Sequence, residues 1–418
     1  MAGVTLLTAC DNALNETDYT YSISSETFYN TVEEANAAVL APLDAMRSAY
    51  NSNFFATLEI NTEYCYPKGV YQTYKQYNGF VNATHMNRSD SNWQSLYKAI
   101  MFCNTAIERI PNATKMTEEE KVAYLGELRF LRGFNYFNLV KYWGGVPLKT
   151  DKNITEWNIP KSSKEEVYNF IIEDLKYALD NCPDKKRYLA TPDKNTVRVC
   201  LADVYMHTGD YIEAKKLSGE VVNSGAYQLV QVAEPRDFDK VFGADLTTST
   251  EEIFYIKTSR IDGKTWDYLS YTSHPKYEFV PGKTMLNGNG YYTHYTDLRN
   301  HIIKSWDTND LRYGMNIGFY VFGKDAYGEY TCLLTKYTDP NAQGNGANVS
   351  IPLIRYTDAM LIYSEACARV ANAPTTESIE MLNQLRRRAY GKDPKVPNAE
   401  LDYKLSDYAS MTAYMDLL

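Results

Sequence analysis

The chain has 418 residues, a hydrophobic content of 44% and a formal net charge of −9 at pH 7. A composition of this kind supports a large globular core, and the acidic balance argues against a nucleic-acid partner, because phosphate binding requires a concentrated basic surface. The sequence holds no apolar run of about 18 residues, the length that predicts a membrane-spanning helix.

Tyrosine is unusually frequent, with 37 tyrosines against 15 phenylalanines and 5 tryptophans. A tyrosine ring combines a flat apolar face with a hydrogen-bonding tip, which suits wet recognition surfaces. The seven cysteines form no C-x-x-C pair and lie away from the five histidines, so the sequence predicts neither a metal site nor a cofactor. Cys103, Cys200 and Cys367 are interpreted as small core residues.

The first 25 residues have the features of a partial lipoprotein signal and a tether. Leu7-Thr8-Ala9-Cys10 has the form of a bacterial lipobox, in which the cysteine receives lipid. Only nine residues precede Cys10, and a complete signal peptide is longer, so we expect the chain to begin within one. Cys10 is therefore the predicted lipidation site, and two or three acyl chains there would give stable anchoring.

Helical periodicity dominates residues 26–225. Thr31 and Ser163 each precede a glutamate by three residues, which is the capping-box pattern of a helix start. Asp90 is predicted to cap a further helix, and its Trp93 is assigned to the core. Trp143 is also assigned to the core, because it lies at the end of a predicted helix.

Residues 125–143 predict a helix that is apolar nearly all round, which places it inside a helical assembly. Gly144-Gly145 supplies a left-handed stop, and Pro147 prevents continuation. The charged residues of this helix need partners or a route to water; they are Arg129, Arg132 and Lys141.

Two helical pairs are predicted further along, the first over residues 195–221. Its pattern L-A-x-x-Y-x-x-x-G-D-Y-x-x-A resembles the middle of a tetratricopeptide repeat. The second pair spans 353–370 and 376–389. Because such pairs stack side by side into a solenoid, the predicted fold is mainly α.

A loop-rich insertion over 225–346 separates these pairs. Residues 252–256 and 319–322 predict short β-strands. The stretch 261–337 contains 11 tyrosines and 2 tryptophans, a mixture that suits shaped loops on a rigid scaffold.

The predicted apolar helix with its turn and the second helical pair together resemble the SusD-like (RagB-like) nutrient-binding lipoproteins. The family's R-F-L-R-A-x-x-Y-F-x-L-V-x-x-W-G-G-V-P-L run is matched over 129–148, with Gly133 in the usual small-residue place, and its second hallmark is matched over 354–366 and 382–386. The resemblance implies a SusD-like α fold that forms a single body over 26–418. It also implies a surface-exposed protein, lipid-anchored to the outer membrane, that captures oligosaccharide for a SusC-like TonB-dependent transporter.

The chain departs from the family pattern at its end, because the E-R-x-x-E-L helix and the R-W-F-D-L-type segment that normally follow are absent. We therefore expect the C-terminal part of the SusD-like body to be missing. Loss of that part would expose apolar surface on neighbouring helices.

The resemblance also implies that the ligand arc is drawn from two regions of the chain that are rich in aromatic residues. No G-x-S-x-G, H-E-x-x-H or P-loop motif occurs, so the sequence predicts glycan binding without enzymatic activity. The alternative for any single ring is packing beneath its own loop, and the alternative function is a repeat scaffold that binds a protein or peptide. The candidate glycan-binding residues are Tyr66, Tyr71 and Tyr74 in the first region, and Trp266, Tyr268, Tyr271, Tyr291 and Tyr292 in the second.

Overall fold

The computed structural model describes residues 28–50, 52–60, 62–76, 83–261, 263–287, 290–291, 293–319, 331–342, 344 and 346–418. The predicted lipidation site Cys10, the tether over 11–25, and most of the strand predicted over 319–322 lie outside the described residues.

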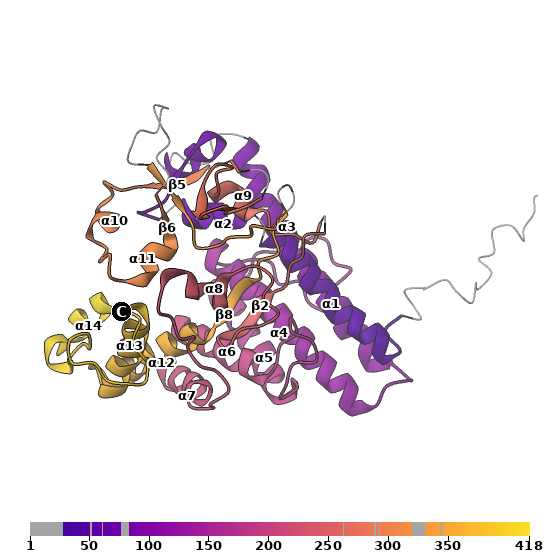
Figure 1. Ribbon diagram of the computed structural model, residues 1–418. Helices are drawn as coiled ribbons and strands as arrows, with labels where there is room; N and C mark the ends of the chain where they lie inside the picture. The colour runs from indigo at the N-terminus through magenta and orange to yellow at the C-terminus, as the bar shows by residue number, and fades with distance from the viewer. Residues whose placement is uncertain are drawn as a thin grey trace, which may run out of the picture.

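The longer helices pack largely in chain order. Helix α1 packs on α3, α3 on α4, α4 on α5, α5 on α6, α6 on α7, α7 on α12 and α12 on α13. This row of antiparallel helices forms one side of the molecule (Figure 1), and the predicted mainly α class is confirmed. The bounds are α1 Val32–Ala49, α3 Ala83–Arg109, α4 Glu118–Trp143, α5 Lys164–Asn181, α6 Lys194–Thr208, α7 Tyr211–Val222, α12 Tyr356–Ala371 and α13 Thr376–Ala389.

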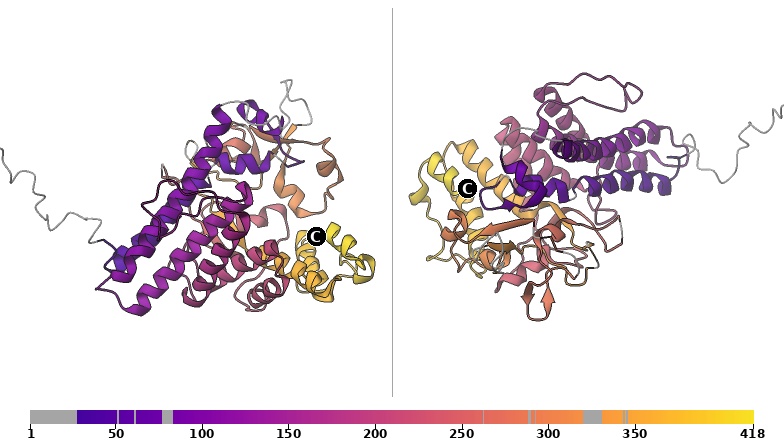
Figure 2. Two further views of the ribbon diagram at one scale, coloured as in Figure 1. Left: turned by 180° about the vertical axis from the view of Figure 1, so that it is seen from behind. Right: turned by 90° about the horizontal axis from the view of Figure 1, so that it is seen from above.

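Most of the shorter elements form the other side of the molecule, as the view from above in Figure 2 shows, whereas the short helix Met411–Leu417 packs against α12 and α13. Among the described residues, the strands form a four-stranded sheet in the order β1-β5-β7-β6 and the two pairs β2-β8 and β3-β4. The strands are β1 Tyr66–Pro67, β2 Glu252–Ile256, β3 Glu278–Val280, β4 Lys283–Thr284, β5 His294–Asp297, β6 Ile317–Gly318, β7 Thr331–Leu334 and β8 Ile351–Arg355. The short helices are α2 Ser52–Glu59, α8 Asp239–Phe242, α9 Tyr268–Thr272, α10 His301–Ser305, α11 Leu311–Asn316 and α14 Met411–Leu417.

Helix α4 occupies the centre of the core, as its apolar character predicted. It contacts both α3 and α5, and its Phe130 and Phe134 rings lie edge-on against Phe254 of β2, with centroids 5.2 and 5.5 Å apart. Every residue of β2 is buried. Strand β2 therefore closes the face of α4 that the neighbouring helices leave uncovered.

The charged residues of α4 have the partners that the sequence required. The Arg132 guanidinium donates to both oxygens of Asp174, at 2.7 and 2.8 Å, and to Asp151 at 2.7 Å. Arg129 stacks on the Tyr177 ring at 4.2 Å, and the Lys141 ammonium lies 4.1 Å from the Phe137 ring.

Helix starts at Thr31 and Ser163 show complete capping boxes, and the six described cysteines are buried and free.

Two predicted boundaries are wrong. Helix α3 begins at Ala83, seven residues before Asp90, and residues 353–355 belong to β8 rather than to α12. Pairing of β8 with β2 supplies backbone partners that the local helical pattern does not reveal. No helix within the described ranges is both long enough and apolar enough to cross a membrane.

Candidate ligand-binding surface

The two aromatic regions predicted from the sequence meet in the four-stranded sheet. Strand β1 pairs antiparallel with β5, so that Tyr66 lies opposite Tyr295 and Pro67 lies opposite His294. The Lys68 amide extends this pairing by donating to the Thr293 carbonyl at 2.8 Å. Segments more than 200 residues apart in the sequence therefore lie side by side.

Three of the predicted residues form a buried layer beneath this surface. Trp266, Tyr71 and Tyr268 are only 1%, 2% and 5% exposed. The Trp266 ring stacks on Tyr268 at 5.3 Å and meets Tyr337 edge-on at 4.9 Å. Their rings have no free face, so the expectation that these three residues contact ligand directly is corrected: they support the surface.

Helix α2 ties this buried layer to the helical body. Its Phe55 ring lies 5.1 Å from Trp266 and 5.4 Å from Tyr268, and α2 also packs against α9, the helix that carries Tyr268 and Tyr271. The loops are therefore held on a rigid support, as recognition loops commonly are.

Tyr271 and Tyr291 form the part of the cluster that reaches solvent, and we call this pair the tyrosine surface. Tyr271 is half-buried and Tyr291 is 42% exposed. Their ring centroids are 5.7 Å apart at 64°. The Tyr291 amide donates to the Ser270 carbonyl at 2.6 Å, so a backbone hydrogen bond joins the two segments that carry these rings.

Tyr66 lies apart from the tyrosine surface. Successive residues of a strand point to opposite faces of a sheet, so Tyr295 and His294 lie on opposite faces. Tyr66 pairs with Tyr295, and their ring centroids are 5.9 Å apart, so Tyr66 lies on the face opposite to His294. Its hydroxyl accepts from the Asn300 amide at 2.8 Å, and the Lys75 ammonium lies 4.3 Å from its ring. The side chain of Tyr74, in the 3-10 helix Gly69–Gln76, and the whole of Tyr292 lie outside the described part.

His294 is a residue of this region that the sequence analysis missed. Its ring lies 5.0 Å from Tyr71, 6.0 Å from Tyr271 and 6.2 Å from Tyr268. Burial lowers its pKa from 6.5 to about 4, and its Nε2 has no hydrogen-bond partner among the described residues. The sequence His-Tyr-Thr-Asp of β5 has no apolar alternation that would place this histidine inside, and its burial follows from the sheet.

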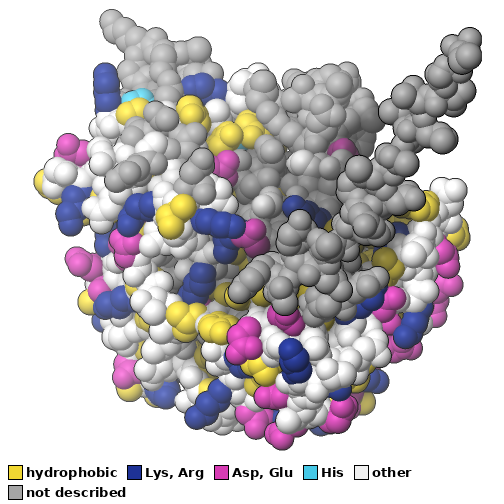
Figure 3. Space-filling model, turned by 90° about the vertical axis from the view of Figure 1, so that its right-hand side faces the viewer, with side chains coloured by type: hydrophobic (Ala, Val, Ile, Leu, Met, Phe, Trp, Pro, Cys, Tyr) yellow, Lys and Arg dark blue, Asp and Glu magenta, His cyan; other side chains and the backbone are white. Residues whose placement is uncertain are grey.

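The chemistry of the tyrosine surface suits a neutral polyhydroxylated ligand. Flat phenol rings stack on the apolar C–H face of a sugar, and their hydroxyls hydrogen-bond at its edge. No group of three or more possible metal-ligating side chains occurs in the described ranges. On the face shown in Figure 3, acidic and basic side chains are interspersed over the described part.

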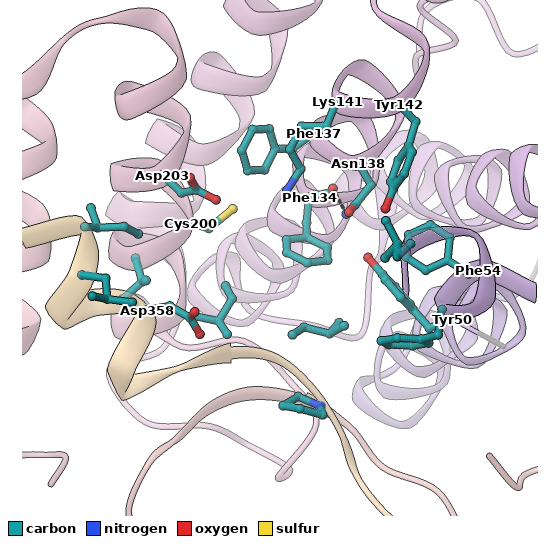
Figure 4. Close-up of a pocket in the computed structure, with 18 residues that line it drawn as sticks. Tyr50, Phe54, Phe134, Phe137, Asn138, Lys141, Tyr142, Cys200, Asp203 and Asp358 are labelled. Carbon is teal, nitrogen blue, oxygen red and sulfur yellow. Dashed lines mark hydrogen bonds between the residues drawn. The ribbon is translucent and has the colours of Figure 1, made fainter. Parts of the chain in front are cut away.

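A separate pocket of about 480 Å³ lies between α4, α6 and the start of α12. Figure 4 shows Phe137 and Lys141 of α4 facing Asp203 of α6, with Asp358 of α12 below them. Asp203 is paired with His207 at 3.3 Å, and Asp358 accepts the Arg355 amide at 2.6 Å. Both carboxylates are therefore engaged, and the remaining wall is mostly apolar.

Fold and surface together define a mainly helical scaffold that carries an aromatic patch on supported loops. Residues 11–206 match the family model described as "Starch-binding associating with outer membrane", and residues 205–408 match that of the SusD family. The chain belongs to the SusD/RagB family.

Similarity to individual relatives extends over nearly the whole chain. A SusD-like protein of Formosa agariphila is 25% identical over 99% of this chain and 86% of its own length, and one of Bacteroides ovatus is 26% identical over 92% and 74%. Among solved structures, a SusD homolog from Bacteroides thetaiotaomicron has a TM-score of 0.77 at 19% identity, over 94% of this chain and 83% of its own. A laminarin-binding SusD-like protein has a TM-score of 0.72 at 18% identity, over 92% and 87%.

Proposed function

We propose that this protein binds glycan at the cell surface and delivers it to a SusC-like TonB-dependent transporter. The observation that carries the proposal is the tyrosine surface, an exposed ring pair fixed on supported loops in a chain of the SusD/RagB family. The laminarin-binding neighbour of the same fold supports a polysaccharide ligand.

Binding would combine ring stacking with hydrogen bonds at the sugar edge. Each stacked ring contributes roughly 0.5–1.5 kcal/mol beyond area burial, so a few such contacts give a weak to moderate affinity that permits later release. We propose binding without hydrolysis, and purified protein incubated with its polysaccharide should release no reducing sugar.

The test of the function is a glycan array probed with the purified chain, with laminarin included. We expect retention of one class of neutral glycan. An array with no retained glycan, together with recovery of a soluble protein partner, would favour a peptide-binding scaffold instead.

Membrane attachment is proposed to occur through acylation of Cys10. The lipobox pattern and the outer-membrane association in the description of the matched family model support this. In cells that export the protein, Cys10→Ser should move it from the membrane fraction to the soluble fraction. Recovery of the transporter with the anchored protein, but not with an unrelated lipoprotein, would test the partner.

A further inference from the structure

A second aromatic site lies on the outer side of α3, away from the tyrosine surface. It is a slot of about 440 Å³, within the range of small-ligand pockets. None of the residues that line it belongs to the four-stranded sheet or to α9. Its aromatic walls are Trp93 and Tyr97 of α3 and Trp157 of the loop that follows α4.

Trp157 is the feature of this slot that core packing does not explain. Its side chain is 93% exposed. The other four tryptophans are buried or half-buried and pack against other rings; for example, Trp93 meets Trp143 edge-on at 5.2 Å. The Lys149 ammonium lies 5.9 Å from the centroid of its ring. An exposed tryptophan offers a large flat apolar surface and an N–H donor, the combination that is enriched at binding sites.

Hydrogen bonds hold the loop that carries Trp157 in one conformation. The Lys149 ammonium donates to the carbonyls of Ile154, at 3.0 Å, and of Glu156. The Asn153 side chain accepts from the Thr150 amide at 2.7 Å and donates to the Leu148 carbonyl at 3.0 Å.

The stem of the loop is fastened to the core helices as well. Tyr136 of α4 and Asn104 of α3 both donate to the Lys149 carbonyl, at 2.6 and 3.0 Å, and Tyr97 donates to the Pro147 carbonyl at 2.7 Å. Because the backbone of this loop is already braced, little backbone entropy is lost when a ligand binds there.

The slot defines the chemistry of its ligand. Three aromatic side chains line the slot, so it suits a molecule with an apolar face. At the rim, Gln94 and Lys98 are exposed on α3, and the Lys98 ammonium makes no ion pair within the described part of the chain. These groups offer hydrogen bonds to the edge of that molecule. A pyranose ring has both features.

We propose that this slot is a second glycan-binding site, in which one sugar unit lies between Trp157 and α3. It rests on the proposed function in that both sites take glycan, but it does not depend on the tyrosine surface. Two sites on one protein would hold a polymer more strongly than either site alone, through effective concentration.

The experiment is affinity electrophoresis in gels containing laminarin or one of a panel of other soluble polysaccharides. Wild type is compared with Trp157→Ala, Tyr291→Ala and the double variant, with Trp157→Phe as the matched control that keeps a flat ring. We expect Trp157→Ala to weaken retention about two- to tenfold, the loss of one stacked ring. Trp157→Phe should remain close to wild type, and only the double variant should lose retention completely.

Several outcomes separate this site from the proposed function. If Tyr291→Ala alone abolishes retention and Trp157→Ala changes nothing, the second site is overturned and the function stands. If Trp157→Ala alone abolishes retention, the second site is supported and the tyrosine surface is overturned. Retention of wild type by no polysaccharide overturns both.

A second readout uses the fluorescence of Trp157, because it is the most exposed of the five tryptophans. A bound polysaccharide should protect part of the emission from acrylamide quenching, and this protection should be smaller in Trp157→Phe, in which half-buried Trp93 is the one tryptophan left in the slot. Equal quenching of wild type with and without a retained polysaccharide overturns the site, as does protection by a hydrophobic peptide in place of glycan.

Discussion

Replacing Arg132 by methionine should destabilise the protein more than any comparable change on α4. Arg132 is 2% exposed and donates to Asp174, Asp151 and Asn104, with each distance between 2.7 and 2.8 Å. Burial raises the pKa of Asp174, and the Arg132 guanidinium opposes that rise. Methionine fills similar volume but removes the cation that hydrogen-bonds to the buried Asp174 carboxylate, leaving Arg129 at 3.8 Å as its cationic neighbour.

Removing one partner of a buried ion pair costs about 3–5 kcal/mol, and here Asn104 and Asp151 also lose a donor. The change is measured as the shift in the urea midpoint followed by circular dichroism. Arg129→Met is the matched control on the same helix, because Arg129 is partly exposed and lies 3.8 Å from Asp174; it should cost less than about 1 kcal/mol.

The double variant Arg132→Met with Asp174→Leu should recover much of the loss, because it removes the orphaned charge. An Arg132→Met midpoint equal to that of Arg129→Met would refute the argument that the buried pair organises α4 and α5.

Three further predictions concern the fold around the candidate surface. Trp266→Ala should lower stability by about 3–5 kcal/mol, measured by thermal denaturation, because its ring is 1% exposed; an unchanged melting temperature would show that the ring is not packed. Gly126→Ala should destabilise the protein by about 1–3 kcal/mol, and more than Gly133→Ala does. A Cβ at Gly126 would lie 2.8 Å from the Cys182 backbone nitrogen, whereas a Cβ at Gly133 would meet the Leu175 side chain at 3.3 Å. A lower urea midpoint for Gly133→Ala than for Gly126→Ala would contradict this packing. The pKa of His294 is about 4 in the folded protein against 6.5 for a free histidine, so the unfolded chain takes up a proton first as the pH falls, and roughly 3 kcal/mol of stability should be lost between pH 6.5 and 4. Urea titrations of wild type at both pH values should show this loss, and an equal loss in His294→Gln would contradict the prediction.

The helical part of the fold could be predicted because its signals are local. The apolar surround of α4, the capping boxes and the turn at Gly209 each specify structure within a few residues. The start of α12 was placed too early because residues 353–355 pair with β2, about 100 residues away. Local periodicity carries no information on that contact.

The candidate surface could be predicted by region but not by residue. The two aromatic regions predicted from the sequence do lie side by side, through β1 and β5. Strand β1 has only two residues, however, too few for an alternation pattern to show which face Tyr66 occupies. Burial of Trp266 depends on Phe55 and Tyr337, which come from distant parts of the chain. Trp157 was overlooked because its loop has no periodicity, and only the structure shows its exposure.

The central claim is that the tyrosine surface binds glycan, and calorimetric titration tests it most directly. A glycan identified on the array is titrated into wild type, Tyr291→Ala and Tyr188→Ala, the last a control at a tyrosine that is 49% exposed elsewhere. We predict an affinity about two- to tenfold weaker for Tyr291→Ala, with Tyr188→Ala equal to wild type and all three proteins equally stable. Equal affinities for wild type and Tyr291→Ala would contradict the account.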